Sequence, residues 1–235
     1  MIDAHIHILN GLDDGAGSID DSCQMALNAQ KCGFKKIIAT PHYIENYLEI
    51  GYNIVEDKVY KLNKILQANN ISVEVHCGNE IYYTDNIIDI LENKKAHTLN
   101  NSKYFLMELP IVGMPINYVD VVKDCVDKGY IPVIAHAERY EWFDKGYEDF
   151  VKLKDLGVKF QVNYGSIIKE YGSKPRKNVI KMFKNDVVDF ICTDAHRVGT
   201  VYKNFEKIKK KIISLCGNEK FSMLTSKNIY DILKN

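Results

Sequence analysis

Histidine and acidic side chains recur in this sequence at the ends of short apolar runs, where they could bind metal ions. His5 and His7 close the first run, and Asp194 and His196 follow the last one. In an extended strand, side chains two residues apart project from the same face, so both imidazoles of His5-x-His7 could reach one ion. Imidazole nitrogens and carboxylate oxygens together suit Mn²⁺, Fe or Zn²⁺. The pattern indicates a metal centre without cysteine ligands.

Other candidate ligands share this placement after an apolar run: His42, Glu80, Glu108 and His136. Each one alone has an ordinary explanation, such as a helix cap or a surface charge. Their recurrence at six of seven expected strand ends is what favours a common site. His76 and His97 lack an obvious partner and are interpreted as structural.

Bringing these side chains together requires a particular arrangement of elements. The expected strands are 2–7, 36–40, 72–77, 104–108, 131–136, 159–163 and 187–193. The expected helices are 19–32, 53–69, 85–93, 116–128, 147–156, 175–185 and 201–215, with small closing helices in 219–233. This alternation predicts a parallel sheet covered by helices and closed as an α/β barrel, with an open doubly wound sheet as the alternative. In a barrel the carboxyl ends of the strands meet at one rim, where active sites are built.

Length and composition fit one soluble domain spanning 1–235. The 31 basic and 31 acidic residues cancel, which argues against a general nucleic-acid or membrane-surface binder. The six cysteines include no C-x-x-C pair and are typical of reduced thiols. No signal-peptide pattern or membrane-spanning run is seen, so we expect a cytoplasmic protein without membrane insertion. The lysine-rich run at 207–211 is interpreted as the solvent face of an amphipathic helix.

Seven motifs follow one another along the chain: D-A-H-I-H at 3–7, D-D-G at 13–15, T-P-H at 40–42, G-N-E at 78–80, M-E-L at 107–109, A-H-A-E-R-Y at 135–140 and T-D-A-H at 193–196. Together they resemble the PHP (polymerase and histidinol phosphatase) superfamily. The likeness is strongest to the bacterial protein-tyrosine phosphatases of capsule and exopolysaccharide operons, the CpsB/YwqE type, and runs from residue 1 to about 197. The resemblance implies a distorted (β/α)₇ barrel with three metal ions, often manganese.

The resemblance also implies how the ligands divide among the ions. The first ion would be bound by His5, His7, Glu80 and Asp194. The second would be bound by Glu80, Glu108 and His136, and the third by Asp14, His42 and His196. Asp14 is preferred to Asp13 because the family ligand directly precedes the glycine, here Gly15. Other branches carry histidines in place of Asp14 and Glu108, so the carboxylates favour the tyrosine-phosphatase branch.

Side chains that could contact a substrate lie beside these motifs. Arg139 matches a family arginine that contacts the substrate phosphate. A second family arginine usually follows the D-x-H motif by several residues, whereas here Arg197 follows it at once and Lys203 comes next, so both are candidates. Aromatic residues that could form a rim around a tyrosine ring, with core packing as the alternative, are Tyr43, Tyr47, Tyr82, Tyr83, Tyr140 and Trp142.

The expected reaction follows from the charge of such a centre. Three divalent ions outweigh four carboxylates and one hydroxide by about one positive charge, and Arg139 adds another, so a phosphomonoester dianion would be attracted. We therefore expect a protein-tyrosine phosphatase that uses a metal-activated hydroxide, acting on a bacterial tyrosine kinase with a C-terminal tyrosine cluster that controls capsule or exopolysaccharide synthesis. The alternatives are a histidinol-phosphate or other small phosphomonoester phosphatase, a PHP nuclease, and a non-enzymatic metal-binding module.

Overall fold

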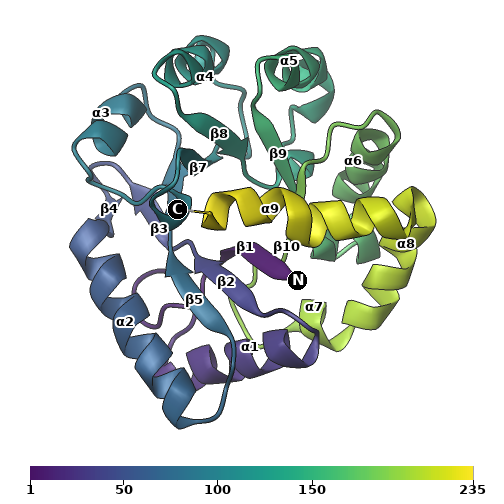
Figure 1. Ribbon diagram of the computed structural model, residues 1–235. Coiled ribbons are helices and arrows are strands. Elements are labelled where there is room, and N and C mark those ends of the chain that lie inside the picture. Colours follow the sequence, from purple (N-terminus) through teal and green to yellow (C-terminus); the bar gives the residue numbers. More distant parts are fainter. Residues whose placement is uncertain (235) are drawn as a thin grey trace.

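The computed structural model describes residues 1–234, so the expected domain of 1–235 extends one residue beyond the described range. Its strands are β1 (Ile2–Ile6), β2 (Lys36–Ala39), β3 (His42–Ile44), β4 (Leu48–Glu49), β5 (Glu74–Cys77), β6 (Glu80–Tyr82), β7 (Tyr104–Glu108), β8 (Ile131–Ile134), β9 (Lys159–Asn163) and β10 (Phe190–Cys192). Its α-helices are α1 (Ile19–Lys31), α2 (Tyr52–Ala68), α3 (Ile87–Glu92), α4 (Tyr118–Asp127), α5 (Phe143–Asp155), α6 (Ser173–Lys184), α7 (Thr200–Lys203), α8 (Phe205–Ser222) and α9 (Asn228–Tyr230). Figure 1 shows the helices arranged around the strands.

The strands form a distorted barrel and pair in parallel, except that the short edge strand β4 pairs antiparallel to β3. One sheet has the order β1-β2-β5, and a second has the order β10-β9-β8-β7-β6-β3-β4. The first sheet continues into the second because β2 leads directly into β3 and β5 directly into β6. At the other edge, a parallel bridge between Ile6 and Ala195 joins β1 to the segment after β10. The expected (β/α)₇ barrel is therefore confirmed, and the open doubly wound sheet is not what forms.

Two strands that we expected to end at a loop instead bend and continue as a second short strand. Pro41 separates β2 from β3, and Gly78-Asn79 separates β5 from β6. A Cβ atom on Gly78 would lie 2.8 Å from Ile38 Cγ2, so the second bend requires glycine. The bends carry His42 and Glu80 inward along the rim instead of leaving them on loops. These short additional strands were not expected from the sequence.

The barrel interior is apolar and is closed at one end by the C-terminal segment. Side chains from the strands, such as Ala4, Leu106 and Phe190, pack with Ile229 and Ile232 in one buried cluster. Figure 1 shows this C-terminal segment crossing the barrel close to the start of β1, at the end opposite the strand tips. The small closing helices that the sequence predicts are present, and they seal the amino end of the barrel. The carboxyl end is left for the polar site.

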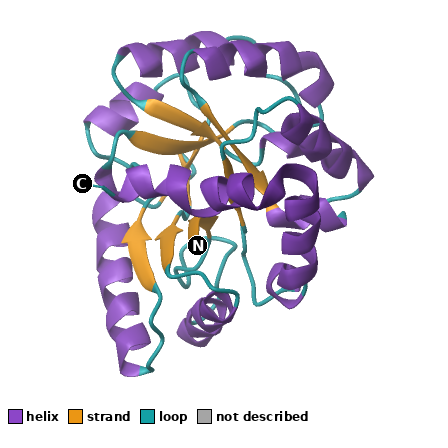
Figure 2. Cartoon of the chain, turned by 45° about the vertical axis from the view of Figure 1, so that its right-hand side comes forward, coloured by secondary structure: helices purple, strands orange, loops and turns teal. Residues whose placement is uncertain are grey.

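The helices lie around the outside of the strands (Figure 2), and their buried apolar residues belong to the hydrophobic core. They agree with the expected ranges to within about two residues, with two exceptions. Helix α5 begins at Phe143 rather than near 147, because Phe143 is fully buried and its packing recruits the preceding turn. The helix expected at 201–215 is instead split into α7 and α8. No helix within residues 1–234 combines the length and apolar character needed to cross a membrane.

Candidate metal centre

Glu80 lies at the centre of a cluster of imidazoles. Its Oε1 atom lies 3.3 Å from His5 Nε2 and 3.1 Å from His136 Nε2. Its Oε2 atom lies 3.3 Å from His7 Nε2 and 3.1 Å from His42 Nδ1. The carboxylate is 1% exposed, so imidazole nitrogens from β1, β3 and the segments after β1 and β8 surround a buried anion. This is the position expected of a carboxylate that bridges two ions.

Asp194 provides the second buried carboxylate of the cluster. Its Oδ1 atom lies 3.3 Å from His5 Nε2 and 3.6 Å from His7 Nε2. Its Oδ2 atom points the other way and accepts hydrogen bonds from Asn163 Nδ2 at 2.7 Å and Arg139 Nη1 at 3.0 Å. One oxygen therefore faces the histidines while the other is fixed by two donors.

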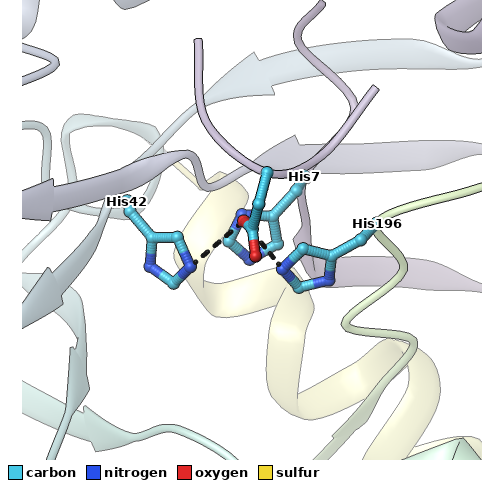
Figure 3. Close-up of side chains that lie close together, drawn as sticks. His7, His42 and His196 are labelled. Carbon is cyan, nitrogen blue, oxygen red and sulfur yellow. Dashed lines mark ion pairs between the residues drawn. The ribbon is translucent and has the colours of Figure 1, made fainter. Parts of the chain in front are cut away.

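A third group of ligands lies towards solvent. Asp14 Oδ1 is 3.5 Å from His42 Nε2 and 3.3 Å from His196 Nε2. Figure 3 shows His7, His42 and His196 converging, and the rings of His7 and His196 stack with their centroids 3.9 Å apart. The Asp14 side chain is 68% exposed, which places this group at the outer edge of the site. It matches the set expected for the third ion, with His7 close by.

Glu108 completes the cluster beside the expected second ion. Its Oε1 atom lies 3.4 Å from His136 Nε2, and its Oε2 atom lies 3.9 Å from His42 Nδ1. Burial and the adjacent Glu80 carboxylate raise the pKa of Glu108 to about 8. All nine candidate ligands thus lie in one connected cluster. His42 lies close to Glu80 and Glu108 as well as to Asp14 and His196, whereas the expected division assigns it to the third ion alone.

The ligands are oriented by side chains that the sequence interpretation missed. Asp13 Oδ2 lies 2.7 Å from His7 Nδ1, which directs His7 Nε2 towards Glu80. Gln161 Oε1 lies 3.1 Å from His5 Nδ1 and does the same for His5. Gln161 and Asn163 are two residues apart on β9, so strand periodicity was the available signal that both side chains face the site. Such partners fix the tautomer of a metal-binding histidine.

The backbone is also unusual at two candidate ligands. His136 and Asp194 adopt positive φ angles of 29° and 49°, each two residues after the end of its strand, β8 or β10. Positive φ is unfavourable for residues with a Cβ atom and persists where the surrounding structure imposes it, often at functional sites. Close packing also constrains the D-D-G motif, because a Cβ atom on Gly15 would lie 2.3 Å from the carbonyl oxygen of His7.

The charges of the neighbouring side chains shift the pKa values within this cluster. Burial lowers the pKa of His5, but the carboxylates of Glu80 and Asp194 outweigh it and raise that pKa to about 9. For Asp194, burial raises the pKa, but the neighbouring His5 and His136 hold it at about 2. The Nδ1 atom of His42 is buried without a hydrogen bond, although it faces Glu80 at 3.1 Å. The His42 nitrogen and the Glu80 carboxylate oxygen face each other in a way that suits a divalent cation between them.

Comparison with known proteins agrees with the motif pattern. The family model described as "Capsular polysaccharide synthesis, CpsB/CapC" matches residues 1–234. The chain belongs to the CpsB/CapC family. It is 34% identical over 205 residues to the tyrosine-protein phosphatase YwqE of Bacillus subtilis, covering 87% of this chain and 80% of that protein. It is 26% identical over 243 residues to the tyrosine-protein phosphatase CpsB of Streptococcus agalactiae, covering 100% and 99% of the two chains.

Solved structures give the same family and fold. A structure from work on YwqE of Bacillus subtilis and CpsB of Streptococcus pneumoniae, described there as metal-dependent tyrosine phosphatases, matches with a TM-score of 0.93. It is 31% identical and covers 100% of this chain and 95% of that chain. A histidinol phosphate phosphatase from Lactococcus lactis matches with a TM-score of 0.59 at 12% identity, covering 91% and 93% of the chains, and shows a shared fold.

In this CpsB/CapC chain the cluster opens into a pocket of about 320 Å³. Arg139 and Arg197 both line it, together with Tyr171. The Arg139 guanidinium lies over the Tyr171 ring, 4.4 Å from the ring centroid. Lys203 is not among the described residues that line this pocket, so the geometry favours Arg197 as the second cation.

None of the six aromatic residues considered for a rim is among the described residues that line this pocket, and for three of them the alternative of core packing is what the structure has. Tyr43, Tyr140 and Trp142 are buried in the core, with at most 6% exposure. Tyr140 is held there by its hydroxyl, which donates to Ala135 O and accepts from Leu109 N. The aromatic side chain that does line the pocket is Tyr171, which follows β9 by eight residues and carries no motif signal.

Proposed function

We propose that this chain is a metal-dependent protein-tyrosine phosphatase. The observation that carries the proposal is the convergence of nine nitrogen- and oxygen-bearing side chains, Glu80 and Asp194 among them, in one cluster, with two arginines lining the same pocket. The names of the family members at 26–34% identity support the same activity. The proposed product pair is inorganic phosphate and a tyrosine side chain.

The proposed cofactor is a set of three divalent ions, Mn²⁺ before Fe or Zn²⁺. His5, His7, Glu80 and Asp194 would hold the first ion; Glu80, Glu108 and His136 the second; Asp14, His42 and His196 the third. When bound, such ions polarise phosphoryl oxygens and acidify water at the site. The mixed imidazole and carboxylate set suits these metals and contains no thiolate.

The side chains of the pocket have complementary tasks. Arg139 keeps one Nη atom on Asp194, and its ring contact with Tyr171 fixes the plane of the guanidinium. The remaining N–H groups of Arg139 are available for phosphate oxygens, to which charge-assisted hydrogen bonds are strong. Arg197 lines the same pocket and adds a second positive charge. The two arginines together favour a dianionic phosphomonoester over a neutral ligand.

The leaving group decides between substrates at such a centre. A tyrosine hydroxyl has a pKa near 10, so tyrosinate departs readily without a strong general acid, whereas a serine alkoxide does not. The pocket is bordered by segments after β1, β8, β9 and β10 and is open enough to receive a side chain on a flexible segment. We therefore propose a phosphotyrosine protein as substrate, and specifically the C-terminal tyrosine cluster of a bacterial tyrosine kinase that controls capsule synthesis.

The proposed compartment is the cytoplasm, and the support for it is chemical. The six cysteines are all free thiols in the structure, including the partly exposed Cys23, Cys32 and Cys216. Unpaired cysteines of this number are usual in a reducing compartment.

One comparison of substrates tests the proposal. The kcat/KM values of a phosphotyrosine peptide, the matched phosphoserine peptide, histidinol phosphate and a short oligonucleotide are measured at one Mn²⁺ concentration. We expect the phosphotyrosine peptide to be hydrolysed fastest, with no loss of rate after thiol alkylation. A tenfold advantage for histidinol phosphate or for the oligonucleotide would contradict the proposed activity even if the metal centre is correct.

A further inference from the structure

The basic residues of this neutral chain are concentrated on one part of its surface. Helices α6 and α7 and residues 205–215 of α8 together carry ten lysine and arginine side chains but only one acidic one, Glu206. The rest of the chain carries the balancing negative charge, since the totals are equal. We call these three segments the basic band. A local excess of this size produces a positive potential that overall charge conceals.

The charges of the basic band face solvent. Lys177 and Lys184 on α6, and Lys207 and Lys210 on α8, are exposed. Within residues 1–234, none of these four lies within ion-pair distance of a carboxylate. Helices α6 and α8 pack against each other (Figure 1), which brings their lysine-bearing segments side by side. The lysine run on α8 does bury Ile208 and Ile212, as an amphipathic helix should, but α6 adds a second set of cations beside it.

The basic band begins at the rim of the candidate site. Helix α6 starts two residues after Tyr171, and α7 starts three residues after Arg197, both of which line the pocket. With a rise of about 1.5 Å per residue, Lys177 lies only roughly 6 Å along α6 from its first residue. A peptide that places one side chain in the pocket could therefore contact the basic band with residues a few positions away in its own sequence.

A groove within the basic band gives it a specific shape. Ile167, Ile180 and Leu215 line a hollow of about 210 Å³ between α6 and α8. Arg176 and Lys211 stand at the same hollow. Leu215 is 43% exposed, so its side chain is accessible at this hollow. An apolar hollow flanked by two cations suits a peptide that carries an apolar side chain among acidic ones.

We infer that the basic band is a docking surface for an acidic segment of the phosphoprotein substrate, with an apolar side chain of that segment in the hollow between α6 and α8. The inference rests on the proposed phosphatase activity, because it assigns the band to the same substrate. Single-stranded nucleic acid fits less well, since no aromatic side chain of the described part of the band is among the exposed ones that could stack on bases. An anionic membrane also fits less well, because Leu215 is the large apolar side chain that the band exposes, whereas peripheral helices present several.

Charge reversal tests the inference. The variant Lys177→Glu/Lys210→Glu is compared with Lys61→Glu/Lys64→Glu, a reversal of the same number of charges on the exposed face of α2, where Lys61 is ion-paired with Asp57. Each protein is assayed on free phosphotyrosine, on a phosphotyrosine peptide with a neighbouring acidic segment, and on the same peptide with the acidic residues replaced by glutamine and asparagine. We expect the wild type to prefer the acidic peptide through a lower KM, and added salt to remove this preference. We expect kcat/KM of the band variant to fall roughly tenfold for the acidic peptide and to stay unchanged for the other two substrates. We expect the α2 variant to behave as wild type.

Binding assays keep this inference separate from the proposed activity. Fluorescence anisotropy with the unphosphorylated acidic peptide measures docking even if no phosphate ester is hydrolysed. Lack of hydrolysis of every phosphotyrosine compound, with peptide binding intact, would overturn the proposed activity and would leave the docking surface supported. Equal kcat/KM values of the wild type for the acidic and neutral peptides would overturn the docking surface. Tighter binding of an oligonucleotide, or of phosphatidylglycerol vesicles, than of the acidic peptide would also overturn it.

Discussion

Arg139 donates a hydrogen bond from Nη1 to Oδ2 of Asp194 across 3.0 Å. The arginine expected to bind phosphate is therefore attached to a carboxylate whose other oxygen faces His5 and His7. This contact couples the position of the proposed phosphate-binding cation to that of the candidate metal ligands. It also satisfies part of the charge of Asp194, which is 2% exposed at its side chain.

Replacing Arg139 should separate phosphate binding from metal binding. Asn163 still holds Asp194 Oδ2 at 2.7 Å when the arginine is removed, so the carboxylate keeps its orientation. We expect Arg139→Ala to lower kcat/KM on a phosphotyrosine peptide by about 10²-fold or more with metal content unchanged. Enzyme kinetics and elemental analysis check this, with Lys145→Ala as the control. Unchanged kinetics would remove Arg139 from the site.

The second cation can be identified by a paired substitution. Arg197 lines the pocket, whereas Lys203 lies on α7 and is exposed. We expect Arg197→Ala to raise KM for phosphotyrosine peptides about tenfold or more, because a charge-assisted contact is lost. Lys203→Ala should leave kcat/KM for free phosphotyrosine close to that of the wild type. The reverse result would assign the role to Lys203.

Asp13 offers a test of ligand orientation. Its carboxylate lies 2.7 Å from His7 Nδ1 and accepts hydrogen bonds from the backbone N–H groups of Gly15 and His42. Asp13→Asn keeps the size but removes the charge that favours the required tautomer of His7. Loss of such a partner typically weakens metal binding by about 10–100-fold. Titration with Mn²⁺ measures the change, and Asp124→Asn on the exposed face of α4 is the control. Equal Mn²⁺ affinity in Asp13→Asn and wild type would show that Asp13 does not orient the ligand.

Metal removal should abolish activity without unfolding the chain. The barrel core is built from apolar side chains of every strand and is closed by Ile229 and Ile232, so it does not depend on the ions. Small zinc domains unfold without metal because they lack such a core. We expect an unchanged far-ultraviolet circular dichroism spectrum after chelation, loss of hydrolysis, and recovery on adding Mn²⁺. Full activity in protein shown by elemental analysis to be metal-free would rule out the proposed mechanism.

His97 predicts a pH dependence of stability that is separate from the metal centre. It is fully buried, stacks on Tyr52 and lies 3.0 Å from the Tyr52 carbonyl oxygen. Burial lowers the pKa of His97 below its usual value of about 6.5. The unfolded chain therefore takes up this proton more readily, and the free energy of unfolding falls as pH drops below about 6.5.

The matched measurement uses His97→Gln. At pH 7.5 the variant should be less stable by about 1–3 kcal/mol, since hydrogen bonds and packing are lost. At pH 5 the difference from the wild type should be smaller, because the variant has no proton to take up at this position. Urea unfolding of both chelated proteins at the two pH values checks this. A difference that stays constant with pH would show that His97 does not titrate between the states.

The sequence determined the family, the barrel and the set of candidate ligands. Strand period placed His5 and His7 on one face, and the position of Glu108 and His136 after apolar runs put them at one rim. These inferences succeed because parallel strands of a barrel all end at the same side, so the local pattern alone predicts the neighbourhood.

Only the tertiary structure decided how the site is held in place. Gln161 and Asn163 show no motif, and their role depends on β9 lying beside β8 and β10. The core positions of Tyr140 and Trp142, and the pocket position of Tyr171, depend on how loops fold over the rim. Sequence periodicity describes the face of an element but not the path of the loop that follows it. The basic band likewise exists because α6 and α8, separated along the chain by a strand and a loop, pack side by side and combine charges that are unremarkable when each helix is taken alone.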